Sequence, residues 1–145
     1  MQLIDRHFIE TLAIETRGRG FTDISRRLDD ILRRHGAGEG LATIFIRHTS
    51  ASLTIQENAD PDVREDLLLA FDRLAPESAP YVHTLEGPDD MPAHIKTALT
   101  DTSLSVPVSD GRLMLGTWQG IYVFEHRARP HRREMVVHFV GSAAG

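Results

Sequence analysis

The stretch SLSVPVSDGRLMLGTWQGIYVFEHR, residues 103–127, decides the fold class of this chain. Apolar and β-branched residues recur in two runs, 103–108 and 112–127, and the Ser109-Asp110-Gly111 segment between them is typical of a hairpin turn. EMVVHFV, residues 134–140, predicts a final strand. The last third of the chain is therefore expected to be rich in strands that are joined by hairpins.

The N-terminal part predicts a strand followed by a helix. Residues 2–16 are expected to be extended, because β-branched and aromatic residues alternate there with polar ones. A helix is expected from about Asp23 to His35, with Thr22 as its cap and Gly36 at its end. The glycine-rich segment 36–40 is expected to be a loop.

The middle of the chain adds two strands and two more helices. Residues 41–55 predict two strands with a break near 49–52. Asp60-Pro61 is a strong helix start, because aspartate caps and proline suits the first turn. The expected apolar face of that helix is Val63, Leu67, Ala70, Phe71 and Leu74. A short helix over about 91–99 is expected next, and its core-facing residues would be Ile95 and Leu99.

This order mixes hairpins with inserted helices and does not repeat a strand–helix–strand unit. It predicts an α+β fold, a β-sandwich of two sheets with inserted helices, over a Rossmann-type fold. Neither an internal repeat nor a linker is visible in the sequence. We therefore expect a single domain over residues 1–145.

Composition excludes several functional classes. The chain has no cysteine, so a thiolate nucleophile, a disulfide or a thiolate metal site is excluded. Any metal would need imidazole and oxygen ligands. The net charge of −5 disfavours a general nucleic-acid binder. Because no signal-peptide core and no bilayer-length apolar run is present, the sequence predicts a cytoplasmic protein without a membrane partner.

Two candidate segments flank the second expected strand of the middle region. Arg47-His48-Thr49-Ser50-Ala51-Ser52 ends an apolar strand, and its small hydroxyl residues leave backbone N–H groups approachable, as phosphate sites require. A plain strand end with a solvated histidine is the alternative. Gln56-Glu57-Asn58-Ala59-Asp60 precedes a helix, and capping alone would account for Asp60.

The most informative segment is YVHTLEGPDDMPAHIK, residues 81–96. His83 and His94 flank a Gly-Pro turn together with Glu86, Asp89 and Asp90, and Lys96 follows. Neutral imidazole with carboxylate is the usual ligand set of a catalytic divalent metal when thiolates are lacking. The alternative is a solvated acidic loop in which Asp90 caps the helix.

The segment GTWQGIYVFEHR, residues 116–127, contributes another histidine. Strand alternation places Trp118, Phe124 and His126 on one face and Glu125 on the other. Glu125 and His126 then share a pocket only if the strand bulges. Core packing is the favoured interpretation of the two aromatic residues.

Four arginines without an acid follow this strand. Arg127, Arg129, Arg132 and Arg133, with His131, suit a phosphate group or an acidic neighbour. A solvated hairpin is the alternative.

These segments resemble the YjbQ-like family, to which a secondary thiamine-phosphate synthase activity is attributed. The matching stretches are HTSASLTIQENADPDV (48–63), HTLEGPDDMPAHIK (83–96) and GTWQGIYVFEHR (116–127), with Arg132-Arg133. The resemblance implies a two-sheet sandwich that assembles as a homotrimer, with a site near the subunit boundaries that binds a metal and anions. His48, His83, His94 and His126 match the recurring histidines of the family, and Glu86, Asp89 and Asp90 match its acidic loop.

The leading hypothesis is a metal-assisted enzyme that acts on phosphorylated small molecules. The resemblance implies the joining of a thiazole phosphate to a pyrimidine diphosphate with release of pyrophosphate. A divalent metal, Mg²⁺ or Zn²⁺, would be held by His83, His94 and His126. His48 and Asp90 would assist proton transfer. Phosphate or substrate would be bound by Thr49, Ser50, Glu86, Asp89, Lys96, Arg132 and Arg133.

Two alternatives use the same residues. A metal-dependent phosphoester hydrolase needs the same ligand set and no second substrate. A trimeric metal- or anion-binding module would show saturable binding without turnover.

Overall fold

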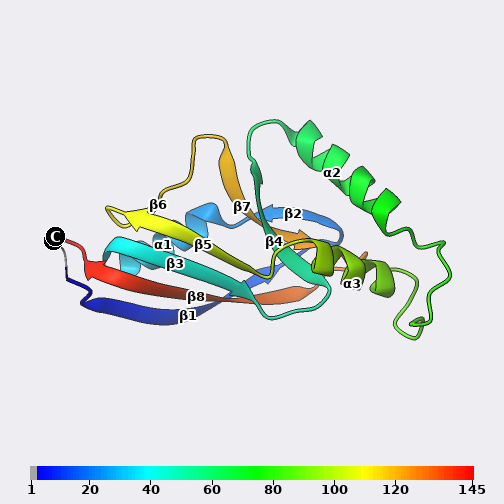
Figure 1. The fold of residues 1–145 in the computed structure, drawn as a ribbon, viewed down its shortest axis with the longest axis horizontal. Helices are drawn as coiled ribbons and strands as arrows, with labels where there is room; N and C mark the ends of the chain where they lie inside the picture. Colours follow the sequence, from blue (N-terminus) through cyan, green and yellow to red (C-terminus); the bar gives the residue numbers. More distant parts are fainter. Residues whose placement is uncertain (1–2) are drawn as a thin grey trace.

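Within residues 3–145, which the computed structural model describes, eight strands form two antiparallel sheets (Figure 1). The five-stranded sheet has the order β1 (Arg6–Glu15), β8 (Arg132–Ala143), β3 (Ala37–Ile46), β5 (Ser103–Ser109) and β6 (Arg112–Leu113). The three-stranded sheet has the order β2 (Gly20–Asp23), β7 (Gln119–Glu125) and β4 (Ala51–Glu57). The helices are α1 (Ser25–Arg34), α2 (Pro61–Leu74) and α3 (Asp90–Leu99). The expected α+β class with two sheets and inserted helices is confirmed.

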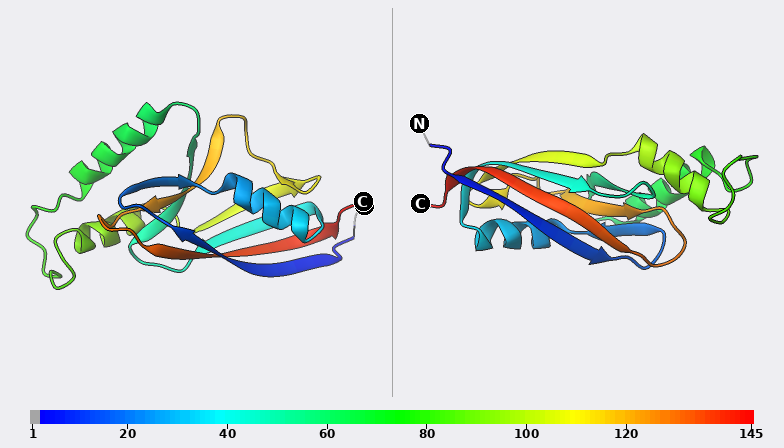
Figure 2. Two further views of the ribbon diagram at one scale, coloured as in Figure 1. Left: turned by 180° about the vertical axis from the view of Figure 1, so that it is seen from behind. Right: turned by 90° about the horizontal axis from the view of Figure 1, so that it is seen from below.

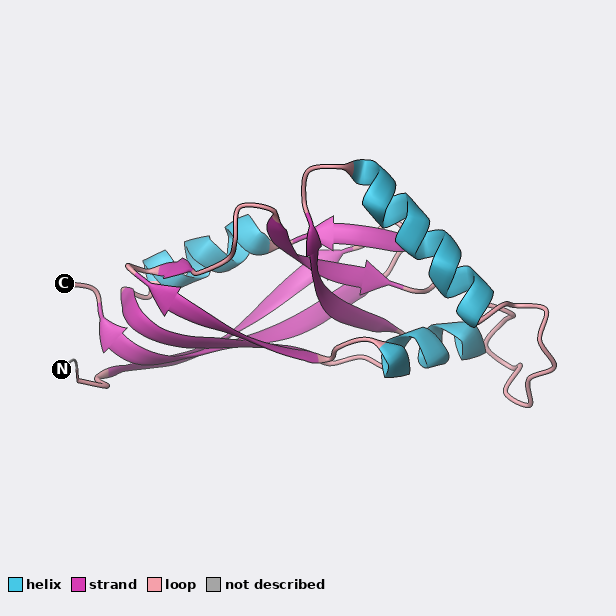
Figure 3. Cartoon of the chain, turned by 45° about the horizontal axis from the view of Figure 1, so that its top comes forward, coloured by secondary structure: helices cyan, strands magenta, loops and turns pink. Residues whose placement is uncertain are grey.

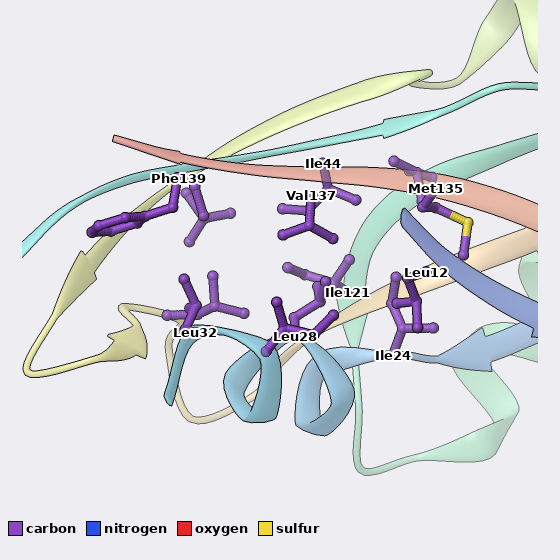
Figure 4. Packing of buried hydrophobic residues seen from close by; sticks show 14 of the residues in the cluster. Leu12, Ile24, Leu28, Leu32, Ile44, Ile121, Met135, Val137 and Phe139 are labelled. Atoms are coloured by element: carbon purple, nitrogen blue, oxygen red, sulfur yellow. The ribbon is translucent and has the colours of Figure 1, made fainter. Parts of the chain in front are cut away.

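The core lies between α1 and one face of the five-stranded sheet. Figure 4 shows Val137 and Phe139 of β8 pointing toward Leu28 and Leu32 of α1. The same buried cluster includes Ile121 of β7, so both sheets share one core. α1 has its apolar residues at helical spacing on one side, which is the pattern that a helix covering a sheet requires.

The opposite face of the five-stranded sheet carries exposed apolar side chains. α1 lies on one side of this sheet (Figure 2, right). Leu41 pairs with Val140, and Phe45 follows on the same face of β3. Ile9 of β1 points the same way and is 62% exposed. We call Ile9, Leu41, Phe45 and Val140 the outer apolar face.

Two expectations at the ends of α1 are wrong. Thr22 does not cap the helix, because it belongs to β2, where it pairs with Val123 of β7. The N–H of Ser25 instead donates to Asp23 Oδ1 at 2.9 Å. The expected loop at 36–40 is the beginning of β3, which starts at Ala37 and pairs with β8.

In the segment 103–127, the predicted hairpin turn is confirmed, and the prediction of one continuous strand after it is wrong. Asp110, with φ of 54°, joins β5 to β6 as the hairpin signal predicts. The second run is not one strand, because β6 ends at Leu113 and the chain crosses to the other sheet before β7. Trp118 lies in that crossing and is 64% exposed, so its expected core packing is wrong, whereas Phe124 is buried.

The helices α2 and α3 lie at the end of the molecule away from the two termini (Figure 3). α2 begins as predicted, with Asp60 accepting the N–H of Asp62. The expected core-facing role of Leu99 in α3 is wrong, because that side chain is 57% exposed. The buried side of α3 consists of Asp90, Pro92, Ala93, Lys96 and Thr97. None of the helices in the described part of the chain is long and apolar enough to cross a membrane.

Candidate functional site

Residues from a loop and a helix meet at the α3 end of the molecule. Asp90 and His94 lie one turn apart on α3, at i and i+4, so their side chains share one side of the helix. The loop between α2 and α3 carries His83 to the same place. Gly87 allows that loop to turn, because its φ of 102° is a conformation that favours glycine.

The three side chains of this site converge on one carboxylate oxygen. Asp90 Oδ2 lies 2.7 Å from His83 Nε2 and 3.1 Å from His94 Nε2. One ligand atom from each of the three residues lies within 4.8 Å of the other two. The Asp90 side chain is only 6% exposed, while those of His83 and His94 are 43% and 33% exposed. The carboxylate of this group is therefore buried, while its two imidazoles are partly exposed to solvent.

The other ring nitrogen of His94 fixes the tautomer of this side chain. His94 Nδ1 lies 2.9 Å from the backbone carbonyl of Thr49, which can only accept, so Nδ1 carries a proton. In the neutral ring Nε2 then offers a lone pair, and it faces the acceptor Asp90 Oδ2. Two acceptors facing each other need a proton or a cation between them.

Arg127 follows β7 and contacts the acidic turn before α3. Its guanidinium donates to Asp89 Oδ2 at 3.0 Å, Asp90 Oδ1 at 2.8 Å and the Glu86 carbonyl at 2.9 Å. Burial opposes ionisation of Asp90, but its hydrogen bond to His83 and the charges of His94 and Arg127 lower its pKa below the ordinary value. Asp90 is therefore held as a carboxylate.

His126, the third expected metal histidine, lies outside this group. It is 1% exposed, and its Nε2 lies 2.8 Å from Ser52 Oγ. Burial, followed by the charge of Lys96, lowers the pKa of His126 to about 3. The residue therefore stays neutral inside the fold. Its place beside Ser52 follows from the pairing of β7 with β4.

Arg133, expected to bind phosphate, and His48, expected to move a proton, form a polar cluster with Glu125 in which Arg133 and Glu125 are buried and His48 is half-buried. Arg133 is 4% exposed and donates to Glu125 Oε1 at 2.8 Å and to the Ser50 carbonyl at 3.2 Å. His48 Nε2 accepts the N–H of Glu134 at 2.8 Å, so its lone pair is engaged. Burial, followed by the charge of Arg133, lowers the pKa of His48. Through the Ser50 carbonyl, this cluster holds the loop between β3 and β4 in place.

Lys96, another expected phosphate ligand, is also turned inward. It is 3% exposed, and its Nζ lies 2.7 Å from Asp72 Oδ1 of α2. The ion pair connects the two helices that flank the site. Its ammonium is therefore occupied by a carboxylate and is not presented to solvent.

The remaining expected site residues divide by exposure. Thr49 contributes its carbonyl to His94, and Glu86 contributes its carbonyl to Arg127. The side chains of Glu86 and Arg132 are exposed, whereas Ser50 is half-buried and its Oγ accepts from Arg133 at 3.1 Å. Asp89 is held by Arg127 and by the N–H of Ala128 at 2.9 Å.

Sequence reasoning assigned Arg127 to a basic patch and missed its role at the acidic turn. No acid lies within 127–133, but the fold brings Asp89 and Asp90 to Arg127 and Glu125 of β7 to Arg133. Asp72 was also missed, because nothing in its local sequence indicates a buried partner, and Ser52 was named in the 47–52 segment without its contact to His126.

The fold and the site together define a class of protein: two antiparallel sheets with an open group of two histidines and one carboxylate at one end. The family model described as UPF0047 protein YjbQ-like matches residues 10–142. The UPF0047 protein sll1880 of Synechocystis is 51% identical over 94% of this chain and 93% of its own length. The UPF0047 protein YjbQ of Escherichia coli O157:H7 is 42% identical over 91% of this chain and 96% of its own.

Solved structures agree with the sequence comparison. A YjbQ/UPF0047 family protein from Clostridium acetobutylicum matches with a TM-score of 0.83 at 37% identity, covering 90% of this chain and 98% of that one. A conserved hypothetical protein from Thermus thermophilus matches with a TM-score of 0.82, also at 37% identity and with the same coverage of both chains. The chain belongs to the YjbQ family of UPF0047 proteins.

Proposed function

We propose that this protein binds a divalent metal ion through His83, Asp90 and His94 and uses it to act on a phosphorylated small molecule. The observation that carries the proposal is the orientation of His94. Its Nδ1 donates to a backbone carbonyl, which is the usual outer contact of a metal-binding histidine, and its Nε2, which carries a lone pair in the neutral ring, faces a carboxylate oxygen. A cation between these atoms would satisfy both acceptors.

The donor set favours Zn²⁺ over Mg²⁺. Two imidazole nitrogens and one carboxylate oxygen form the three-ligand set of catalytic zinc sites, which leave a position open for water or substrate. Mg²⁺ prefers oxygen ligands and retains most of its water. The exposed imidazole side of the group is where a substrate would approach.

Thiamine-phosphate synthesis is the reaction that we propose, on the resemblance described above. A metal bound here would neutralise charge on a departing diphosphate. The exposed Arg132 is the remaining arginine of the expected phosphate ligands, because Arg133 is buried against Glu125. His48 is not part of this mechanism, since a general base needs the lone pair that Glu134 already occupies.

The first experiment measures metal binding by the untagged, chelator-treated protein. Titration calorimetry with Zn²⁺ should give one ion per chain, and His94→Gln should weaken binding at least tenfold. His35→Gln is the matched control, because His35 is also 33% exposed and also contacts one carboxylate, Glu10, at 2.8 Å. Binding that is absent in the wild type, or equal in His94→Gln, would contradict the proposed site.

The second experiment measures the reaction. The Zn²⁺-loaded protein should form thiamine phosphate from the pyrimidine diphosphate and the thiazole phosphate, and His94→Gln should lose that activity. Release of inorganic phosphate without a coupled product would instead identify a phosphoester hydrolase.

A metal- and anion-binding module without turnover is the second candidate function. It is favoured by the engaged state of His48 and the enclosed position of His126, which leave neither histidine available to transfer protons. Tight, saturable binding of Zn²⁺ and phosphate with no product from either reaction would support it.

We also propose that the protein is a homotrimer in which the outer apolar face is covered by neighbouring copies. The exposure of Ile9, Leu41, Phe45 and Val140 on one sheet face supports this proposal, because exposed apolar surface marks interaction sites when it is extensive. Cytoplasmic location and the absence of nucleic-acid partners stay predictions of the sequence.

A further inference from the structure

Arg127 contacts the acidic turn through three of its nitrogens. Nε donates to Asp89 Oδ2, Nη1 to Asp90 Oδ1 and Nη2 to the Glu86 carbonyl, at 2.8–3.0 Å. The arginine side chain is 18% exposed, and those of Asp89 and Asp90 are 15% and 6% exposed. A planar guanidinium with three occupied nitrogens is fixed in both position and orientation.

This arrangement divides the two oxygens of Asp90 between two tasks. Oδ1 accepts from Arg127, and Oδ2 faces both imidazoles. Because Oδ1 is held, the carboxylate plane cannot turn freely, and Oδ2 stays directed at the two Nε2 atoms. The same guanidinium holds the Glu86 carbonyl, three residues after His83, so it also restrains the loop that carries this histidine.

We propose that Arg127 is a positioning residue of the metal site: it orients Asp90 as a ligand and holds the 83–90 loop against the end of β7. The inference rests on the proposed metal-binding function. It assigns Arg127 to the support of a metal ligand and not to phosphate binding, since its contacts are already made to carboxylates and a carbonyl.

Lysine cannot reproduce this role. Its ammonium is a compact charge at the end of a flexible chain, and it cannot reach three acceptors with a fixed planar geometry. Arg127→Lys therefore keeps the positive charge beside Asp89 and Asp90 and removes the orientation. The variant separates positioning from simple neutralisation of the acidic turn.

The test compares the untagged wild type with Arg127→Lys and with Arg34→Lys. Arg34 is the matched control, because both of its Nη atoms contact the Glu10 carboxylate outside the site. Arg127→Lys should weaken Zn²⁺ binding by about 10–100-fold, the usual effect of losing an outer-shell partner. It should also shift the visible absorption bands of the Co²⁺-loaded protein, which report ligand geometry. Arg34→Lys should change neither measurement.

Equal Zn²⁺ affinity and an unchanged Co²⁺ spectrum in Arg127→Lys would overturn the inference and leave the proposed metal site intact. If the wild type binds no metal, the proposed function fails, and the positioning role is measured in the metal-free protein. The ring ¹⁵N shifts of His83 and His94 should then differ between the wild type and Arg127→Lys at one pH, and unchanged shifts would overturn the role. If Arg127→Lys does not fold, Asp89→Asn is the second variant, because it weakens one of the contacts that hold the Arg127 guanidinium. The Co²⁺ absorption bands should then shift in the same direction by a smaller amount. Unchanged bands in Asp89→Asn would overturn the positioning role.

Discussion

His126 is enclosed near the end of β7, where its ring packs against Phe124 and its Nε2 contacts Ser52. Its Nδ1 has no hydrogen-bond partner among the described residues. Burial and the charge of Lys96 lower its pKa to about 3, so the folded protein holds this ring neutral at a pH where an unfolded chain would protonate it.

The stability of the fold should therefore decrease as pH falls from about 6.5 toward 3. Over that range unfolding takes up about one proton at His126, which lowers the free energy of unfolding by about 1.4 kcal/mol per pH unit. His48, whose pKa is also lowered, contributes with the same sign. Urea unfolding at several pH values between 5 and 6.5 gives the slope of the unfolding free energy against pH. In His126→Gln this slope should be smaller by the equivalent of about one proton. An unchanged slope in His126→Gln would contradict this account.

At the scale of elements, α2 and α3 are joined by an ion pair with unequal burial. Lys96 is 4% exposed at its side chain, whereas Asp72 is 40% exposed and also contacts Arg19. Removing Asp72 should therefore destabilise the fold more than removing Lys96 does. Without Asp72 the lysine is a buried charge with no counter-charge, whereas without Lys96 the aspartate is still partly solvated.

Asp72→Ala should destabilise the protein by about 3 kcal/mol or more, and Lys96→Met by about 1 kcal/mol or less, in chemical unfolding. In Lys96→Met, Asp72 still forms its ion pair with Arg19. In Asp72→Ala, the buried Lys96 has lost the carboxylate that it contacts. Zn²⁺ and phosphate binding should survive in Lys96→Met. A loss of phosphate binding there would restore the phosphate role that the sequence predicted for Lys96.

The contact between β3 and β8 depends on two facing glycines. Gly40 pairs with Gly141, and a Cβ added to Gly141 would lie 2.0 Å from the Glu39 carbonyl. Gly141→Ala should therefore lower the free energy of unfolding by about 1–3 kcal/mol, because backbone would have to move. At Gly116 an added Cβ would meet only the Gln119 side chain, at 3.3 Å, so Gly116→Ala is the control and should be close to neutral. Equal stability of the two variants would show that the strands separate easily.

At the scale of the whole molecule, the outer apolar face is an apolar sheet surface that a single chain leaves exposed. If three copies cover it, light scattering should give three times the 16.2 kDa chain mass. Phe45→Asp should lower that mass, because a carboxylate would be buried without a partner in the assembly. Leu74→Asp, at a side chain of α2 that is 64% exposed, is the control and should remain a trimer. A monomeric wild type would contradict the proposed assembly.

Local pattern was sufficient for the elements whose signals are short-range. The Asp60-Pro61 helix start and the Ser109–Gly111 turn are set by backbone conformations that neighbouring residues favour, and both are confirmed. The 83–94 segment also predicted that His83 and His94 lie in one site, but it gave Asp90 a proton-transfer role and His126 the third ligand position, whereas the structure groups Asp90 with the two histidines. These features required no knowledge of distant segments.

Tertiary structure alone decided which polar groups became partners. Asp89 and Asp90, from a distant segment, pair with Arg127, Glu125 of the preceding strand pairs with Arg133, and Lys96 turns inward to Asp72. The crossing between sheets after Leu113 likewise follows from which strands pair, and not from the apolar run that contains it. The physical reason is that the sequence determined which residues carry charge and where turns and helices begin, while burial and long-range pairing determined which charges face solvent and which ring nitrogens remain open to a ligand.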